Sequence, residues 1–151
     1  MDFEGRPARR LTAMKEIRYQ LIFEGKVSPE DDLGAVMRVE TRARFTADAD
    51  PLFSTGAPEA VLDARVVPDE FGGFREEGSI VFGGGTLVYA SEGEGRIGDS
   101  ADPAVQQGHV VRRIESGTGA FEGATGTIVS AFTVNENAMM RDSQSAVIFL
   151  A

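Results

Sequence analysis

Apolar and polar positions alternate with a period of two over residues 15–26. The apolar positions are Ile17, Tyr19, Leu21 and Phe23, and the positions between them are polar except for Ile22. Because successive side chains of a strand point to opposite faces, this period predicts a strand with one apolar face. The sequence SPEDD at residues 28–32 is typical of a turn after that strand.

A second alternating stretch covers residues 35–45. Its polar face carries Arg38, Glu40, Arg42 and Arg44, and its other face is mainly apolar. Two interpretations are open for this regular row of charges. It is either a solvated face with weak cross-strand ion pairs, or a lining of charges at a cavity or at its mouth.

Short apolar runs separated by Gly, Pro, Asn and Asp continue to the end of the chain and predict further strands. These strands are expected at residues 60–67, 74–82, 86–92, 108–115, 125–134 and 145–150. The segments 46–58, 93–105 and 135–142 are predicted to be loops or turns. Helical spacing is not sustained anywhere, so we expect seven or eight strands in an all-β sandwich or closed barrel.

Composition narrows the chemistry that this chain can support. Among 151 residues there is one histidine, His109, and no cysteine. We therefore expect no thiol nucleophile, no Cys-ligated or multi-His metal site and no cofactor. The formal charge of −9 disfavours nucleic-acid partners. No apolar run reaches the roughly 20 residues needed to span a bilayer, and no signal-peptide core is evident, so a cytoplasmic location is expected.

The length of 151 residues suits one domain. Residues 1–13, which include several arginines, are expected to form a flexible arm. Residues 14–151 are expected to form the β domain. Glycine is abundant: 18 of the 151 residues are glycine, about 12% against a usual share of about 7%. This excess indicates many tight turns.

Glycines are concentrated in one segment, residues 116–127 (SGTGAFEGATGT). This segment resembles the G-[ST]-G-x-F-x-G-x-[ST]-G signature of the allene oxide cyclase barrel group, which includes the plant dirigent proteins. The matching residues are Gly117, Thr118, Gly119, Phe121, Gly123, Thr125 and Gly126. The resemblance implies a single antiparallel eight-stranded barrel in which the segment joins two late strands. In that placement Phe121 closes the barrel end.

Members of the resembling group bind an apolar or aromatic molecule inside the barrel, and some steer its cyclisation or coupling without a cofactor. The resemblance therefore implies a cofactor-independent cyclase that confines a hydrophobic, polyketide-like intermediate while a ring closes. A non-catalytic dirigent-like or carrier barrel is the alternative, and a filled structural barrel is a third possibility. The resemblance also implies a homo-oligomer, either a dimer or a trimer.

The candidate site residues come from the polar faces of the first two strands and from a few later positions. The expected catalytic residues are Arg38, Glu40, Gln20 and Tyr89. The expected substrate-binding residues are Arg18, Ile22, Arg42, Met37, Arg113 and Phe132. Those on residues 15–26 assume that the polar face of this strand lines the cavity. If the apolar face fills the barrel instead, the polar face is solvated, and the sequence leaves both arrangements open.

Overall fold

The computed structural model describes residues 14–151, so the arm expected at residues 1–13 lies outside the described residues. The chain forms strands almost throughout this range. The strands are β1 (Lys15–Pro29), β2 (Met37–Arg44), β3 (Glu59–Pro68), β4 (Gly73–Phe82), β5 (Gly85–Ser91), β6 (Gly95–Asp99), β7 (Val105–Gly117), β8 (Thr125–Asn135) and β9 (Met139–Leu150). Two short helices, α2 (Pro51–Ser54) and the 3-10 turn η1 (Gly119–Phe121), lie between strands. Within residues 14–151, no helix has the length and hydropathy to cross a membrane.

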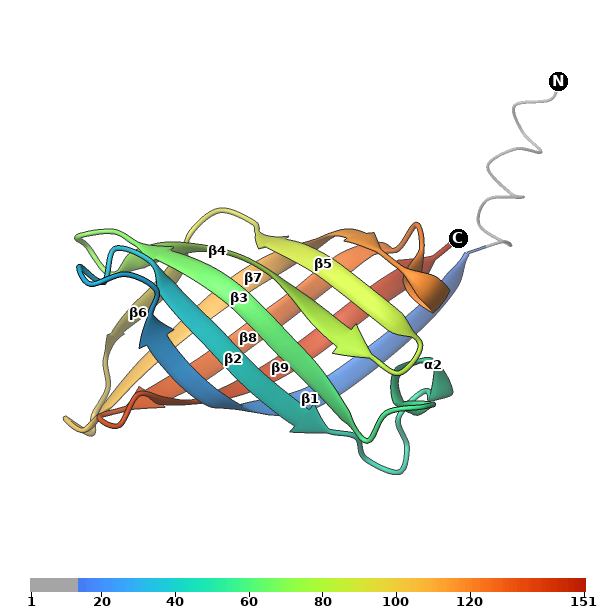
Figure 1. Cartoon of the computed structure of the whole chain (residues 1–151), viewed down its shortest axis with the longest axis horizontal. Helices are drawn as coiled ribbons and strands as arrows, with labels where there is room; N and C mark the ends of the chain where they lie inside the picture. Colours follow the sequence, from blue (N-terminus) through green and yellow to red (C-terminus); the bar gives the residue numbers. More distant parts are fainter. Residues whose placement is uncertain (1–13) are drawn as a thin grey trace, which may run out of the picture.

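Eight of the strands close into an antiparallel barrel (Figure 1). Their order is β3-β2-β1-β9-β8-β7-β5-β4, and pairing between β3 and β4 completes the circle. The longest ladder joins β1 to β9 and pairs Lys15 with Leu150 and Lys26 with Met139 at its two ends. The predicted all-β class and the antiparallel eight-stranded barrel are confirmed.

Strands β5 and β6 occupy one position of the barrel in succession. β5 lies between β4 and β7 as far as Ser91, and β6 then pairs with the same two strands from Gly95 onward. The prediction of a loop over residues 93–105 is therefore wrong for residues 95–99. These residues become a strand because the end of β5 leaves free backbone groups on β4 and β7, and an extended segment satisfies them. Residues 139–142, predicted to be part of a turn, likewise belong to β9.

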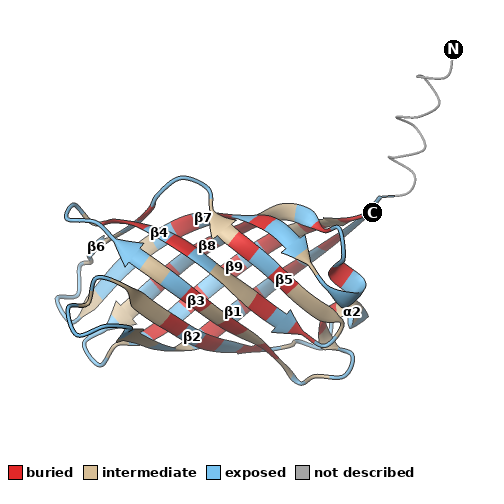
Figure 2. Ribbon diagram, turned by 45° about the horizontal axis from the view of Figure 1, so that its top comes forward, coloured by how far each residue is buried: buried red, intermediate tan, exposed pale blue. Residues whose placement is uncertain are grey.

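The apolar face of β1 points into the barrel. Ile17, Tyr19, Leu21 and Phe23 are at most 6% exposed, and the side chains between them face outward. Buried and exposed positions alternate along most of the other strands as well, with interruptions in β4 and β6 (Figure 2). Of the two arrangements that the sequence left open, the barrel filled by apolar side chains is the one observed.

Aromatic side chains close one end of the barrel. Phe53 of α2 packs 4.9 Å from Phe82, 5.4 Å from Tyr19 and 5.7 Å from Phe121, measured between ring centroids. We call these four residues the aromatic plug. The prediction that Phe121 closes the barrel end is confirmed. Gly119 allows the tight approach at this end, because its φ is +60° and a Cβ there would lie 2.5 Å from the Gly84 carbonyl oxygen.

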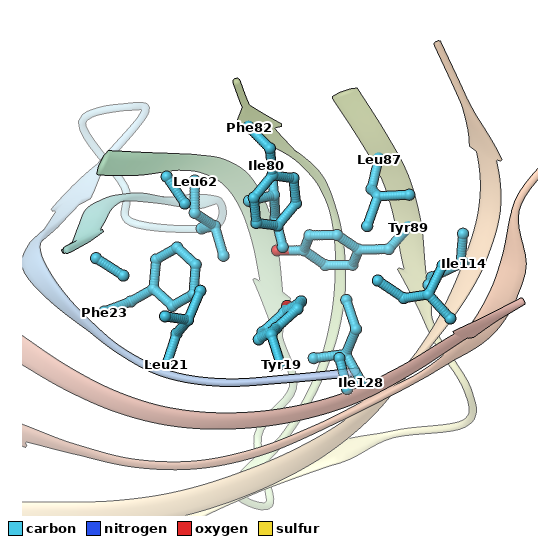
Figure 3. Close-up of a cluster of buried hydrophobic side chains, with 14 of the residues drawn as sticks. Tyr19, Leu21, Phe23, Leu62, Ile80, Phe82, Leu87, Tyr89, Ile114 and Ile128 are labelled. Carbon is cyan, nitrogen blue, oxygen red and sulfur yellow. The ribbon is translucent and has the colours of Figure 1, made fainter. Parts of the chain in front are cut away.

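Two tyrosines reach from opposite walls into the interior. Tyr19 comes from β1 and Tyr89 from β5, and both are surrounded by aliphatic and aromatic side chains (Figure 3). Their hydroxyl groups are the first sign that the interior is not uniformly apolar. A buried phenol needs a hydrogen-bond partner, and the partners identify the candidate site.

Candidate functional site

One arginine and two carboxylate side chains meet inside the barrel. Arg112 of β7 is fully buried, and its Nη2 lies 2.9 Å from Oε2 of Glu76 on β4. Its Nη1 lies 3.4 Å from Oδ2 of Asp142 on β9. The Ser130 hydroxyl donates a hydrogen bond to the other Asp142 oxygen. We call Glu76, Arg112 and Asp142 the buried ion cluster.

Neutral donors extend this cluster across the barrel. The Tyr89 hydroxyl donates to Oε2 of Glu76. On the other side, Nε2 of Gln144 donates to Oδ2 of Asp142 at 2.8 Å, and the Tyr19 hydroxyl donates to Oε1 of Gln144 at 2.7 Å. A continuous polar chain therefore runs from β1 to β4. Because an unpaired charge is costly in a core, these bonds are what make the burial of the cluster tolerable.

Burial and neighbouring charges set the protonation of the donors. Burial raises the pKa of Tyr89 well above 10.0, and the Glu76 carboxylate raises it further. Burial also raises the pKa of Tyr19. For Arg112, burial by itself lowers the pKa, but the adjacent Tyr89, Glu76 and Asp142 outweigh it and the pKa is raised. At neutral pH the phenols are therefore neutral donors and the guanidinium is charged, with its carbon 5.0 Å from the Tyr89 ring centroid.

A cavity of about 340 Å³ opens at the barrel end opposite the aromatic plug. We call it the mouth cavity. Its wall is mainly apolar and includes Val39, Val66, Phe74, Phe132, Val134 and Met140. Two carboxylates also line it: Glu136, which is exposed at the rim, and Glu76, which is 5% exposed. Glu76 lies deeper than Phe74 because β4 begins at the mouth with Gly73 and runs inward.

The contacts of the Glu76 carboxylate are concentrated on one of its two oxygens. Within residues 14–151, both contacts of this carboxylate, from Arg112 and from Tyr89, are made by Oε2. The backbone is fixed as well, because the Glu76 N–H donates to the Ser91 Oγ at 3.0 Å. Oε1 carries neither of the contacts from Arg112 and Tyr89, and Glu76 is one of the residues that line the mouth cavity.

The structure places three of the residues expected at the site on the inside of the barrel. Tyr89 belongs to the polar chain, and Phe132 and Met37 line the mouth cavity. Tyr89 and Phe132 are buried, and Met37 is half-buried at the rim. These three remain part of the candidate site.

The other seven expected residues lie on the outer surface and do not reach the interior. They are Gln20, Arg38, Glu40, Arg18, Ile22, Arg42 and Arg113. Arg38 bonds to Asp63 at 2.8 Å on the surface, and Arg113 bonds to Glu115 at 3.2 Å. The expectation that these residues line a barrel cavity is therefore corrected. The physical reason is parity, since the apolar faces of their strands fill the barrel and turn the polar faces outward.

Sequence reasoning did not select Glu76, Arg112 or Asp142. A signal was present in the alternation itself. In residues 108–115, Arg112 shares its face with Val110 and Ile114, both buried. A single charge on an otherwise apolar face is the mark of a buried charge, whereas a regular row of charges marks a solvated face.

The comparisons add no family to this geometry. No protein-family model and no curated protein matches the chain. Across residues 14–151, no group of three or more His, Cys, Asp or Glu side chains is arranged to hold a metal ion. The mouth cavity and Glu76 are therefore the features of this barrel that suggest a function.

Proposed function

We propose that this barrel binds a small, mainly apolar molecule in the mouth cavity and steers a ring closure within it without a cofactor. The observation that carries the proposal is the buried Glu76 carboxylate, which lines a mainly apolar cavity. Apolar walls with a few fixed polar groups are typical of small-molecule sites. Perturbed or buried ionisable groups in such a cavity are candidates for function.

The walls and the carboxylate have separate tasks in this proposal. The walls hold a flexible ligand with its reacting atoms close together, which lowers the entropic part of the barrier. Oε1 of Glu76 accepts a proton from one ligand atom and returns it to another. Meanwhile the new ring bond forms and one double bond of the ligand becomes a single bond. The closure is then an isomerisation that needs no oxidant or reductant. Arg112 and Tyr89 are positioning residues, because they hold Oε2.

The resemblance of residues 116–127 to the allene oxide cyclase barrel group supports this proposal. The segment joins β7 to β8 and contributes Phe121 to the aromatic plug. The plug leaves the interior accessible from the mouth end, which suits entry of one ligand from one direction.

Ligand binding is tested with a neutral fluorescent dye such as N-phenylnaphthylamine. We expect saturable binding to the native protein and its loss in Val134→Trp, because Val134 lines the mouth cavity. Thr133→Trp is the matched control, since the neighbouring side chain faces outward, and this variant should bind normally. Equal binding by both variants, with both shown to be folded by thermal unfolding, would place the dye elsewhere and contradict the proposal.

Turnover is tested with linear, neutral polyene ketones as polyketide-like probes, followed by chromatography and mass spectrometry. We expect a product of unchanged mass, and a rate at least about 100-fold lower in Glu76→Gln, as for the loss of a general base. Glu77→Gln is the control, because Glu77 is the next residue on β4 and is exposed. Saturable binding with no product would favour the second candidate, a dirigent-like carrier. The contacts of Tyr89 and Arg112 with Oε2 also suit a carrier, since they hold the Glu76 carboxylate in place to bind a ligand.

A further inference from the structure

The mouth end of the barrel is strongly acidic. Four connections meet there, at residues 30–36, 69–72, 100–104 and 136–138. They carry seven carboxylates and no Lys, Arg or His. All seven side chains are exposed, and they are Glu30, Asp31, Asp32, Asp69, Glu70, Asp102 and Glu136. Exposed charges of one sign around an opening attract ions of the opposite sign and repel those of the same sign.

The opposite end does not share this character. Its connections at residues 45–58, 83–84 and 118–124 carry three carboxylates, against seven at the mouth. Carboxylates accept local hydrogen bonds at both ends, and at the mouth these are Asp31, Asp69 and Asp102. Asp48 accepts a hydrogen bond from Thr46, and Asp50 caps α2 by accepting the Leu52 N–H at 3.0 Å. At the mouth, an ion pair from Arg65 at 2.9 Å offsets the charge of Glu30. The excess of negative charge is therefore concentrated around the entrance to the mouth cavity.

The inner end of the mouth cavity also carries an excess of negative charge. The buried ion cluster contains two carboxyl groups and one guanidinium. Arg112 is fully buried, and its two terminal nitrogens face Glu76 and Asp142, while its Nε has no hydrogen-bond partner among residues 14–151. Arg112 does not line the mouth cavity, so it does not present this N–H to an anionic ligand there. Glu76 is the member of the cluster that lines the cavity, and its Oε1 carries neither of the contacts to Arg112 and Tyr89. An ionised carboxylate oxygen accepts hydrogen bonds and cannot donate them.

We propose that the ligand of the mouth cavity is an apolar molecule that carries a protonated amine. The ammonium group donates to Oε1 of Glu76, and the apolar body packs against Phe74, Phe132 and Met140. Burial of the ammonium group is offset by the carboxylate it meets, and the acidic rim excludes carboxylates and phosphates. This inference rests on the proposed function, since it names the ligand class of the same cavity and makes the ammonium nitrogen the ligand atom from which Glu76 accepts the proton.

Three probes with one apolar body test the inference: phenylbutylamine, phenylbutanol and phenylbutyrate. Titration calorimetry at low salt should show the amine binding at least about tenfold more tightly than the alcohol, as expected for a charge-assisted bond. The carboxylate should bind more weakly than the alcohol. Glu76→Gln should remove the preference for the amine, and Glu77→Gln should retain it. Asp31→Asn with Asp32→Asn should slow association of the amine and leave its dissociation rate unchanged.

The outcomes separate this inference from the proposed function. If the alcohol or the carboxylate binds as tightly as the amine, the inference is wrong and cavity binding stands. If none of the three binds, the proposed function fails and the inference fails with it. Should Glu76→Gln not fold, Val134→Trp provides the second variant, because amine binding that survives a filled mouth cavity would overturn the inference.

Discussion

Replacing Arg112 by methionine removes the positive charge of the buried ion cluster. Methionine is unbranched and apolar and can follow the same path between side chains. The variant leaves Glu76 and Asp142, which are 5% and 1% exposed, without the guanidinium nitrogens that lie 2.9 and 3.4 Å from them. Two buried carboxyl groups then lack their counter-charge, while the remaining hydrogen bonds from Tyr89, Ser130 and Gln144 persist.

The expected loss is large for a single substitution. Removing one partner of a buried ion pair costs about 3–5 kcal/mol, because the remaining charge is left uncompensated. For a domain of this size, each kcal/mol lowers the melting temperature by about 2–4 °C. Arg112→Met should therefore melt about 6–20 °C below the native protein. Arg113→Met is the matched control, since its side chain is 57% exposed and its surface pair with Glu115 contributes less than about 1 kcal/mol.

Thermal unfolding followed by circular dichroism at neutral pH measures both variants. A third variant combines Arg112→Met with Glu76→Gln and Asp142→Asn, and it should recover most of the loss because no buried charge remains unpaired. If Arg112→Met and Arg113→Met melt together, the cluster does not stabilise the barrel as argued. If the triple variant gains nothing over Arg112→Met, the contribution of Arg112 is packing of its long side chain and not charge balance.

Two further predictions concern the interior and the plug. Tyr19 and Tyr89 are the two tyrosines of the chain, and burial raises the pKa of both. In the unfolded chain the pKa of tyrosine is about 10. Below that pH the free energy of unfolding does not depend on these two groups. Above it, the free energy of unfolding falls by about 1.4 kcal/mol per pH unit for each tyrosine, because the unfolded state loses the proton and the folded state keeps it. Alkaline titration should therefore show tyrosinate absorbance rising together with unfolding, and tyrosinate in a folded barrel would contradict this. Phe53→Ala should lower the free energy of unfolding by about 3–5 kcal/mol, because it removes the central ring of the aromatic plug. Phe71→Ala is the control, since Phe71 is 82% exposed, and it should change the free energy of unfolding by less than about 0.5 kcal/mol. Equal melting temperatures for the two variants would exclude a stabilising plug.

The strands with one buried face could be predicted from the sequence. β1 was found because burial of a single face imposes a period of two on residues 15–26. β6 could not be found in this way, because the sequence GRIGD at residues 95–99 has neither a period nor an apolar run. Its strand conformation comes from pairing with β4 and β7 beyond the end of β5, which is a tertiary effect.

The candidate site was harder to predict because the choice of inner face decides it. The regular charges at Arg38, Glu40 and Arg42 suggested a charged cavity wall, but this face of β2 is solvated. Tyr89, which was expected to be catalytic, lies in the interior. Its partner Glu76 belongs to a strand with no clean alternation around Gly78. Contacts between β4, β7 and β9 are needed to bring Glu76, Arg112 and Asp142 together, and no local pattern contains them.

The two carboxyl groups of the buried ion cluster differ in what the barrel requires of them. Asp142 is surrounded by Arg112, Ser130 and Gln144, so both of its oxygens are used inside the protein. Glu76 has both of its donors on Oε2, and the residue lines the mouth cavity. Stability alone does not call for such a group, because a buried ion cluster replaced by well-packed apolar residues is often neutral or stabilising. Asp142 is therefore explained by the network it completes, whereas the proposed ligand would account for a buried carboxylate that lines the mouth cavity.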